Sequence, residues 1–147
     1  MPNYKILSFL ILAFSPSLLN AAELQEVKSF SCNYNLSSTA NSNRAEFAPK
    51  ANSKEEISLK FEVVDAENAK GRMVENAKDQ DVQVISGDGI ITFLSKDDAG
   101  KVLVTSIYGQ KDGMGRYFSS YSKHAETPAN ATSSQWYGVC VGSYSGI

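Results

Sequence analysis

The sequence predicts an all-β protein of about eight antiparallel strands, arranged as a meander that forms a closed or nearly closed barrel. Three observations lead to this prediction. Short runs of alternating apolar and polar residues recur along the chain, and turn residues separate most of them. The composition is rich in Ser, Asn, Gly, Tyr, Val and Ile, which favours strands and turns over helices. The two cysteines, Cys32 and Cys140, fall in the first and the last predicted strand.

The strands follow from these patterns in chain order. Phe30 to Leu36 and Ile57 to Val63 alternate apolar with polar residues, so each has one buried face. Gly87, Asp88 and Gly89 join two further runs directly, which indicates a hairpin. The eight predicted strands are Phe30 to Leu36, Ile57 to Val63, Arg72 to Glu75, Val82 to Ser86, Ile90 to Ser95, Val102 to Tyr108, Arg116 to Ser122 and Gln135 to Val141.

Two predicted connections are long. Ser37 to Glu56 is a polar stretch with one large apolar residue, Phe47, and a predicted helical turn at Asn43 to Ala48; Lys123 to Ser134 holds the only histidine, His124. In an eight-strand meander both connections lie at the same end, because strand direction alternates. Long links often carry function on a rigid scaffold, so we expect the main interaction surface there. The turns predicted at the same end are Asn76 to Asp81 and Lys96 to Gly100.

The first residues predict a secretory signal peptide. Lys5 precedes a short apolar run, and the small residues Ala21 and Ala22 follow it. The run is shorter than the roughly 20 residues that a membrane-spanning helix needs. We therefore expect a signal peptide at residues 1–21 and a single β-barrel-like domain at residues 22–147. The protein is predicted to be periplasmic or secreted, without stable membrane insertion.

Export also predicts a disulfide between Cys32 and Cys140, because disulfides persist outside the cytosol. Such a bond needs Cα atoms about 4.4–6.8 Å apart, so the first and last strands must meet. A meander whose ends meet is a closed or nearly closed barrel. A two-sheet sandwich, with the strands meeting across a core, is the alternative.

The sequence argues against most catalytic chemistries. One histidine and a disulfide leave no recognisable Ser–His or Cys–His pair, and zinc would need three or four converging ligands. Acidic residues at 79, 81, 97 and 98 are of the type that binds calcium, but EF-hand spacing is absent and such residues also favour turns. A carboxylate-based hydrolase stays open, because its carboxylates converge in space rather than in sequence. We predict a protein that is not an enzyme and uses no cofactor or metal.

The binding surface is predicted from aromatic and polar residues. Tyr117 and Tyr121 share one face of a strand and Phe118 lies on the other, while Trp136 and Tyr137 point in opposite directions. One set belongs to the core, and the other forms an aromatic stripe suited to binding. No cluster of Lys and Arg indicates nucleic acid as a partner. The candidate surface consists of Phe47, Lys50, Asp79, Asp97, Asp98, His124, Glu126, Tyr117 and Tyr121.

Two short motifs resemble known families. The run Ser-Gln-Trp-Tyr-Gly-Val-Cys at 134–140, with Phe-Ser-Cys at 30–32, resembles small exported bacterial β proteins of unknown function with an early cysteine and a final Gln-aromatic-Tyr-Gly-x-Cys run. Gly-Arg-Tyr at 115–117 resembles part of the pattern of periplasmic lysozyme inhibitors, which are disulfide-stapled eight-stranded barrels. We expect an exported soluble binding protein whose partner is a protein or a small ligand. The alternatives are a periplasmic inhibitor of a secreted enzyme such as lysozyme and a lipocalin-like carrier.

Overall fold

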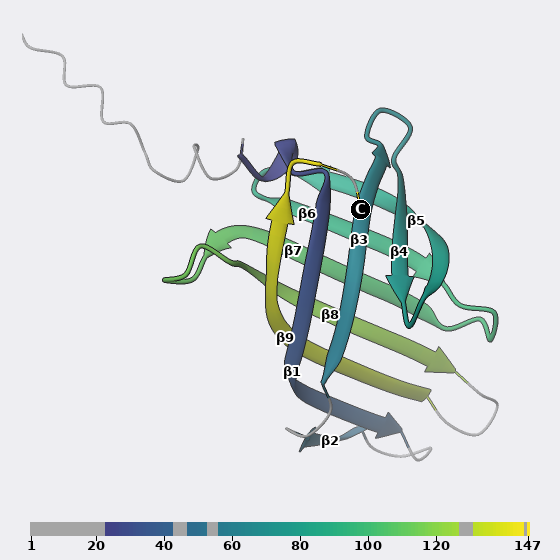
Figure 1. Cartoon of the computed structure of the whole chain (residues 1–147). Helices are drawn as coiled ribbons and strands as arrows, with labels where there is room; N and C mark the ends of the chain where they lie inside the picture. Colours follow the sequence, from purple (N-terminus) through teal and green to yellow (C-terminus); the bar gives the residue numbers. More distant parts are fainter. Residues whose placement is uncertain (1–22, 43–46, 53–55, 127–130, 146) are drawn as a thin grey trace, which may run out of the picture.

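The computed structural model describes residues 23–42, 47–52, 56–126, 131–145 and 147 of the chain. Within these residues it consists of antiparallel strands and one short helix at residues 23–26 (Figure 1). The predicted signal peptide lies outside the described residues and stays a prediction. No helix of the described part is long and apolar enough to span a membrane. The strands are β1 (Ser29–Ser42), β2 (Phe47–Asn52), β3 (Ile57–Asp65), β4 (Lys70–Glu75), β5 (Lys78–Gly87), β6 (Ile90–Lys96), β7 (Val102–Lys111), β8 (Tyr117–Glu126) and β9 (Ala131–Ser143).

Eight of these strands form a closed barrel. Their order is β1-β3-β4-β5-β6-β7-β8-β9, and β9 pairs back with β1 in antiparallel fashion. The remaining strand, β2, pairs with the second half of β1 at residues 37–42. All eight predicted strands are present, and the predicted closed barrel is confirmed. Because the strands pair continuously around the ring, the alternative prediction of a two-sheet sandwich is excluded.

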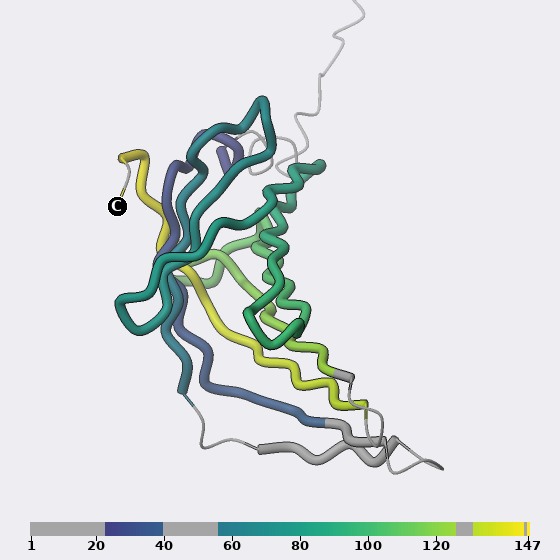
Figure 2. Tube along the Cα trace, turned by 90° about the vertical axis from the view of Figure 1, so that its right-hand side faces the viewer, coloured from purple at the N-terminus to yellow at the C-terminus, as the bar shows by residue number. Residues whose placement is uncertain are grey.

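The longest strands, β1 and β9, bend where they close the barrel. Their register shifts between Tyr34 and Leu36, and such an irregularity changes the direction of a strand. Gly138 of β9 lies opposite Tyr34, and a Cβ placed on it would lie only 1.9 Å from the carbonyl oxygen of Asn33. The absence of a side chain therefore lets the two backbones approach at the bend. Figure 2 shows both strands turning here from the wall that contains β3 toward the wall that contains β8.

The two connections predicted to be long are mostly strand, so this part of the prediction is wrong. Residues 37–42 continue β1 and pair with residues 131–136 of β9, whereas Phe47–Asn52 form β2. The helical turn expected at Asn43 to Ala48 is wrong for Phe47 and Ala48, which lie in β2; residues 43–46 lie outside the described residues. The second half of β1 has neighbours on both edges, so ladder hydrogen bonds stabilise it without the large apolar residues by which strands are recognised.

Aromatic side chains fill the barrel in two groups. The first group packs edge to face and face to face, with ring centroids of Phe61 and Phe93 4.6 Å apart and those of Phe30 and Tyr117 6.0 Å apart. The second group contains Tyr34, Tyr121 and Trp136 and is described with the pocket below. Such contacts between large rings contribute beyond the apolar area that they bury. The interior is a packed core, built from inward-facing alternate residues of the strands.

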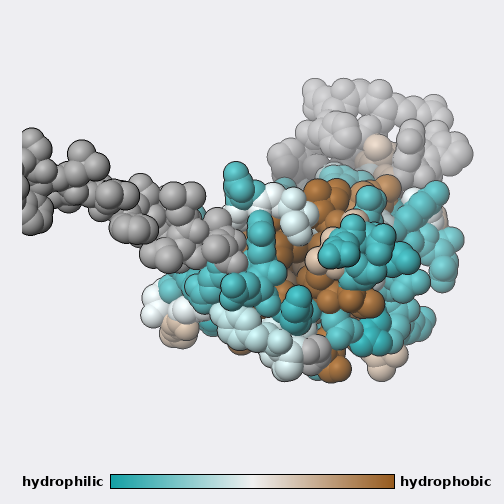
Figure 3. All heavy atoms as spheres, turned by 90° about the horizontal axis from the view of Figure 1, so that it is seen from above, coloured by the Kyte–Doolittle hydropathy of each residue, from teal (hydrophilic) through white to brown (hydrophobic). Residues whose placement is uncertain are grey.

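One end of the barrel is closed by the chain that precedes β1. Leu24 and Val27 are buried against the core, and the Lys111 ammonium donates to the Glu23 carboxylate at 2.7 Å. The side-chain amide of Gln25 reaches the carbonyl oxygen of Gly87 at 3.4 Å. We call this end, with the helix at residues 23–26, the closed end. Viewed from the side of this helix and the β3–β4 turn, apolar residues gather in the middle and hydrophilic residues surround them (Figure 3).

The opposite end, here called the open end, carries the turns at residues 76–77 and 97–101 and the pairing of residues 37–42 with residues 131–136. Because strand direction alternates around the barrel, the two long connections and the two turns that the sequence predicted at one end lie together, as far as the structure describes them. Two of the links between them, residues 53–55 and 127–130, lie outside the described residues.

Candidate binding site

The disulfide joins the two strands that close the barrel. Cys32 and Cys140 are directly opposite in the β1–β9 ladder and form an S–S bond of 2.02 Å, which confirms the predicted pair. Their Cα atoms are 4.0 Å apart, slightly less than the range expected above and near the spacing of about 4.5 Å for directly opposed, non-hydrogen-bonded residues. Both side chains are buried, and no free cysteine occurs among the described residues. The bond fixes β1 to β9 close to their bend.

A pocket of about 290 Å³ opens at the open end of the barrel. It has polar groups around its rim and aromatic rings among its walls. β3, β4, β8 and β9 all contribute, so the pocket is built on strands rather than on loops alone. Its lining consists of Glu56, Ile57, Ser58, Glu75, Asn76, Tyr121, Lys123 and Trp136.

The aromatic part of this pocket is a stack that continues into the core. Trp136 and Tyr121 stack with ring centroids 5.1 Å apart, and Tyr34 follows Tyr121 at 5.8 Å. The hydroxyl groups of Tyr34 and Ser119 are 2.9 Å apart and hydrogen-bonded, and burial raises the pKa of Tyr34 above its ordinary value. Tyr34 is thereby held as a neutral phenol, and the stack above it is fixed in position.

Trp136 brings an unused hydrogen-bond donor into this region. Its Nε1 is buried and has no hydrogen-bond partner, a property shared among the described residues only by Nε of Arg72. An unsatisfied buried donor costs about 1–3 kcal/mol. A ligand or water oxygen that reached this nitrogen would recover that free energy. Trp136 is also the single tryptophan of the chain, so its fluorescence reports on this pocket alone.

Electrostatics at the pocket favour a protonated tyrosine beside carboxylates. Burial, followed by the negative charges of Glu75 and Asp97, raises the pKa of Tyr121 to about 12. Its hydroxyl therefore stays protonated at neutral pH and can donate a hydrogen bond. The charged residues of the lining are two carboxylates, Glu56 and Glu75, and one ammonium group, that of Lys123. The pocket thus combines donors and acceptors and carries slightly more negative than positive charge.

The acidic residues of the predicted surface lie at the open end, mostly in structural roles. The sequence placed Asp79 in a turn, which is wrong: it lies in β5. Its carboxylate forms an ion pair with Arg72 at 3.3 Å. Asp97 accepts hydrogen bonds from the backbone N–H groups of Ala99 and Lys101, both at 2.9 Å, and so shapes its turn. No group of three or more His, Cys, Asp or Glu residues in the described part is arranged to hold a metal.

His124 lies in β8 and not in a loop, because β8 extends further than predicted. Its ring nitrogens contact the hydroxyl groups of Ser122 and Ser133, both at 3.2 Å, and its side chain is exposed. The structure also places Phe47 and Lys50 on β2 and Glu126 at the end of β8, where their backbones pair with Ser42, Thr39 and Ala131.

The predicted role of Tyr117 at the surface is wrong. Its side chain is only 3% exposed, packs at the closed end, and lies under the Lys111 ammonium, which is 4.6 Å from the ring centroid. Tyr121 also points inward, although it reaches the open-end pocket. Phe118 of β8 and Tyr137 of β9 are exposed instead, on the outer face of the barrel. The alternation was recognised in the sequence, but the wrong face was assigned to the surface.

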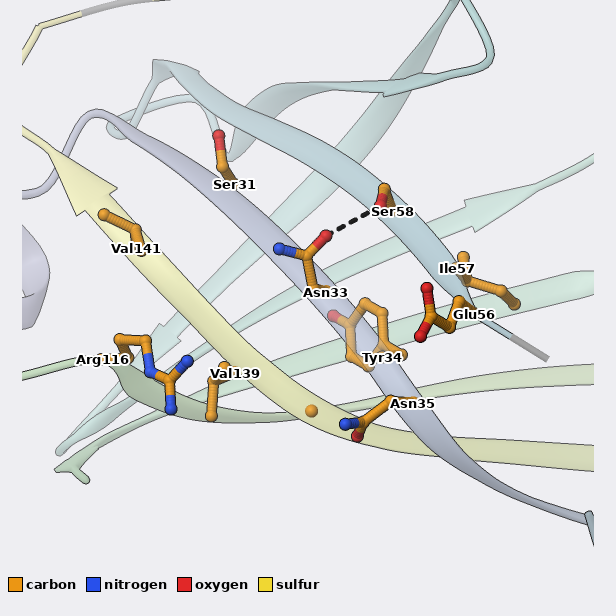
Figure 4. A pocket seen from close by; sticks show the side chains of 11 residues that line it. Ser31, Asn33, Tyr34, Asn35, Glu56, Ile57, Ser58, Arg116, Val139 and Val141 are labelled. Atoms are coloured by element: carbon orange, nitrogen blue, oxygen red, sulfur yellow. Dashed lines mark hydrogen bonds between the residues drawn. The ribbon is translucent and has the colours of Figure 1, made fainter. Parts of the chain in front are cut away.

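A second pocket, of about 380 Å³, lies on the outer wall around β1 and β9 (Figure 4). The hydroxyl of Ser58 donates to Oδ1 of Asn33 at 2.7 Å, and Figure 4 shows the Asn33 amide nitrogen directed away from Ser58. We call this surface the outer platform. Its outward residues are polar or small apolar ones that sequence reasoning did not select, although period-2 alternation marks them as the outer faces of their strands. Its lining is Ser31, Asn33, Tyr34, Asn35, Glu56, Ile57, Ser58, Arg116, Gly138, Val139 and Val141.

Comparisons with known proteins do not assign the chain to a family. No family model, curated protein or solved structure matches it. The fold and the two pockets define the protein as a disulfide-stapled, closed β-barrel with surface pockets. The resemblance to small exported bacterial β proteins stays a prediction from the sequence.

Proposed function

We propose that this chain is an exported, soluble, non-enzymatic binding protein that receives its partner at the open end of the barrel. The observation that carries the proposal is the contrast between the two ends. Leu24 and Val27 fill the closed end, whereas the open end presents a pocket lined in part by Trp136, whose buried Nε1 has no hydrogen-bond partner. Concave sites with an apolar part and a few convergent polar groups are typical of ligand recognition.

The packed interior favours an interaction protein over a lipocalin-like carrier. A carrier needs an apolar cavity inside the barrel, but Phe30, Phe61, Phe93 and Tyr117 occupy this space and contact one another. The open-end pocket is small and lies beyond this core. A group inserted by a larger partner suits it better than a whole lipid or other large apolar ligand. Inhibition of a secreted enzyme is one specific form of this function.

A charge reversal at the rim tests the proposal. Glu75→Lys places a cation beside Lys123 at the pocket, so a partner adapted to the native charge should bind about tenfold more weakly, which corresponds to about 1.4 kcal/mol. The matched control is Asp88→Lys in the exposed β5–β6 turn at the closed end, and it should leave affinity within about twofold.

The measurement uses immobilised protein exposed to the periplasmic or culture fluid of the host, with captured components quantified by mass spectrometry. A captured component is then titrated against the free protein while Trp136 emission is followed. Loss of binding in Glu75→Lys alone, with an emission change in the wild type, supports the open end. Equal binding by both variants, or loss in Asp88→Lys alone, would contradict it.

A further inference from the structure

The outer platform is a regular grid of side chains on neighbouring strands. In the ladders around β1, Asn33 lies opposite both Val139 of β9 and Ser58 of β3, while Ser31 lies opposite Val141. Residues in such positions project from the same face of the sheet. Polar groups on β1 and β3 therefore face the outside beside an apolar strip on β9. A ligand lying across these strands would meet hydrogen-bonding groups and an apolar surface at the same time.

The amides of the platform have free hydrogen-bonding capacity. Asn33 accepts from Ser58 through Oδ1, which orients the amide and leaves both protons of Nδ2 without a partner among the described residues. The Asn35 side chain has no hydrogen-bond partner within the same part of the chain, and Figure 4 shows it on the side of β9. A side-chain amide can both donate and accept hydrogen bonds. Hydroxyl groups of a ligand can also do both, so they suit this surface well.

The charges of the platform do not favour an ionic ligand. Arg116 donates to Asp112 through Nε at 2.8 Å and forms an ion pair with it through Nη2 at 2.6 Å, and this guanidinium lowers the pKa of Asp112. The positive charge is thus already balanced. Glu56 is the one carboxylate in the pocket lining, and it is exposed to solvent, where its charge is screened.

Apolar groups beside the platform complete the arrangement. Val141 is 58% exposed, and Phe118, opposite Val139 in the β8–β9 ladder, is 45% exposed. Tyr137, on β9, is 46% exposed. A sugar ring has an apolar face of C–H groups and an edge of hydroxyl groups, so it matches an apolar strip bordered by amides and hydroxyls. Aromatic side chains next to such a strip give a flat surface for further rings.

We propose that the outer platform binds a neutral oligosaccharide, with Asn33, Asn35 and Ser58 bonding its hydroxyl groups and Val139, Val141 and Phe118 contacting its ring faces. Glu56, Ile57 and Ser58 also line the open-end pocket, but Asn33, Val139 and Phe118 do not, so variants at Asn33 and Phe118 test this proposal separately from the first. Its volume of about 380 Å³ is near the lower end of the range of about 300–1,000 Å³ for small-molecule sites, which fits a short saccharide.

The disulfide makes this platform rigid. Cys32 and Cys140 point into the core, directly behind the outward positions Asn33 and Val139 that adjoin them in sequence. A site whose backbone is fixed before binding loses little conformational freedom when it binds. Rigidity matters for a polyhydroxylated ligand, because its hydrogen bonds to the protein largely replace those to water and leave a small net gain.

The test is a titration of isotopically labelled protein followed by amide chemical shifts. The probes are maltotriose and the trimer of N-acetylglucosamine, which distinguish plain from N-acetylated neutral saccharides, with a sulfated oligosaccharide as the charged comparison. Saturable shifts are expected for at least one neutral trimer, with a dissociation constant on the order of 1 mM for a shallow, solvent-exposed site. They should fall on residues 31–35, 58 and 137–141, and the Trp136 side-chain signal should not move.

Two variants and one control complete the test. Asn33→Leu and Phe118→Ala should each weaken binding about tenfold, whereas Gln83→Leu, which removes another exposed amide on β5 away from the platform, should not change it. Unchanged spectra outside the platform show that each variant is folded. Absence of saturable shifts with both neutral trimers, saturation by the sulfated probe alone, or full binding by Asn33→Leu would overturn the proposal.

Discussion

Replacing both Cys32 and Cys140 with Ala is expected to lower the free energy of unfolding by about 2–5 kcal/mol. The bond spans 108 residues of sequence and joins β1 to β9, where the barrel closes. In the unfolded chain such a cross-link removes the conformational freedom of a long loop, and in the folded chain it holds a pair of strands that no turn connects. Urea unfolding of the wild type and the double variant measures the difference.

Reduced wild-type protein serves as the control, because it loses the cross-link but keeps both sulfur atoms in the core. Its stability should lie near that of the double variant, with the remaining difference due to the smaller alanine side chains. Intact mass after alkylation, with and without reductant, checks that the native protein carries the bond. A double variant within about 0.5 kcal/mol of the oxidised wild type would contradict the predicted role of the bond in closure.

Substituting Gly138 with Ala is expected to destabilise the protein by at least about 3 kcal/mol, because the new methyl group has no space. Its Cβ would lie 1.9 Å from the carbonyl oxygen of Asn33 and 2.7 Å from Cα of Tyr34, and both are backbone atoms that cannot rotate away. β9 would have to move from β1 at the bend, which opens the barrel close to the disulfide. Thermal and urea unfolding measure the loss.

Gly113→Ala is the matched control for this substitution. Gly113 lies in the β7–β8 turn, where an added Cβ meets nothing within 4 Å and where the backbone φ is not positive. The control should change stability by no more than about 0.5 kcal/mol. If Gly138→Ala were as stable as Gly113→Ala, the close approach of β9 to β1 would be incorrect.

Much of the fold could be predicted because inward and outward residues alternate. Ile57 to Val63 and Val102 to Tyr108 carry this alternation with β-branched and aromatic residues, and both are strands. The pairing of Cys32 with Cys140 then predicted that the first and last strands meet, either side by side in a closed barrel or across the core of a sandwich. β2 and the second half of β1 were missed because ladder hydrogen bonds, which leave no mark in side-chain type, stabilise them. The second half of β1 pairs with β2 on one edge and with β9 on the other, and β2 pairs with β1.

The site was less predictable, because its composition depends on which face of each strand turns inward. Tyr117 and Phe118 are adjacent, and the sequence shows only that they point in opposite directions. Their assignment follows from the whole ring of strands, which places Tyr117 in the core and Phe118 outside. The unpartnered Nε1 of Trp136 likewise follows from three-dimensional packing and has no sequence signal.

The most direct test of the central claim, that the open end of the barrel receives the partner, is site-specific photo-cross-linking in the organism that makes the protein. A photoreactive amino acid is placed at Lys123, on the open-end pocket, and in a separate variant at Asp88, in the turn at the closed end. The account predicts a discrete cross-linked product from position 123 and none from position 88. A product from position 88 alone, or equal products from both positions, would contradict it.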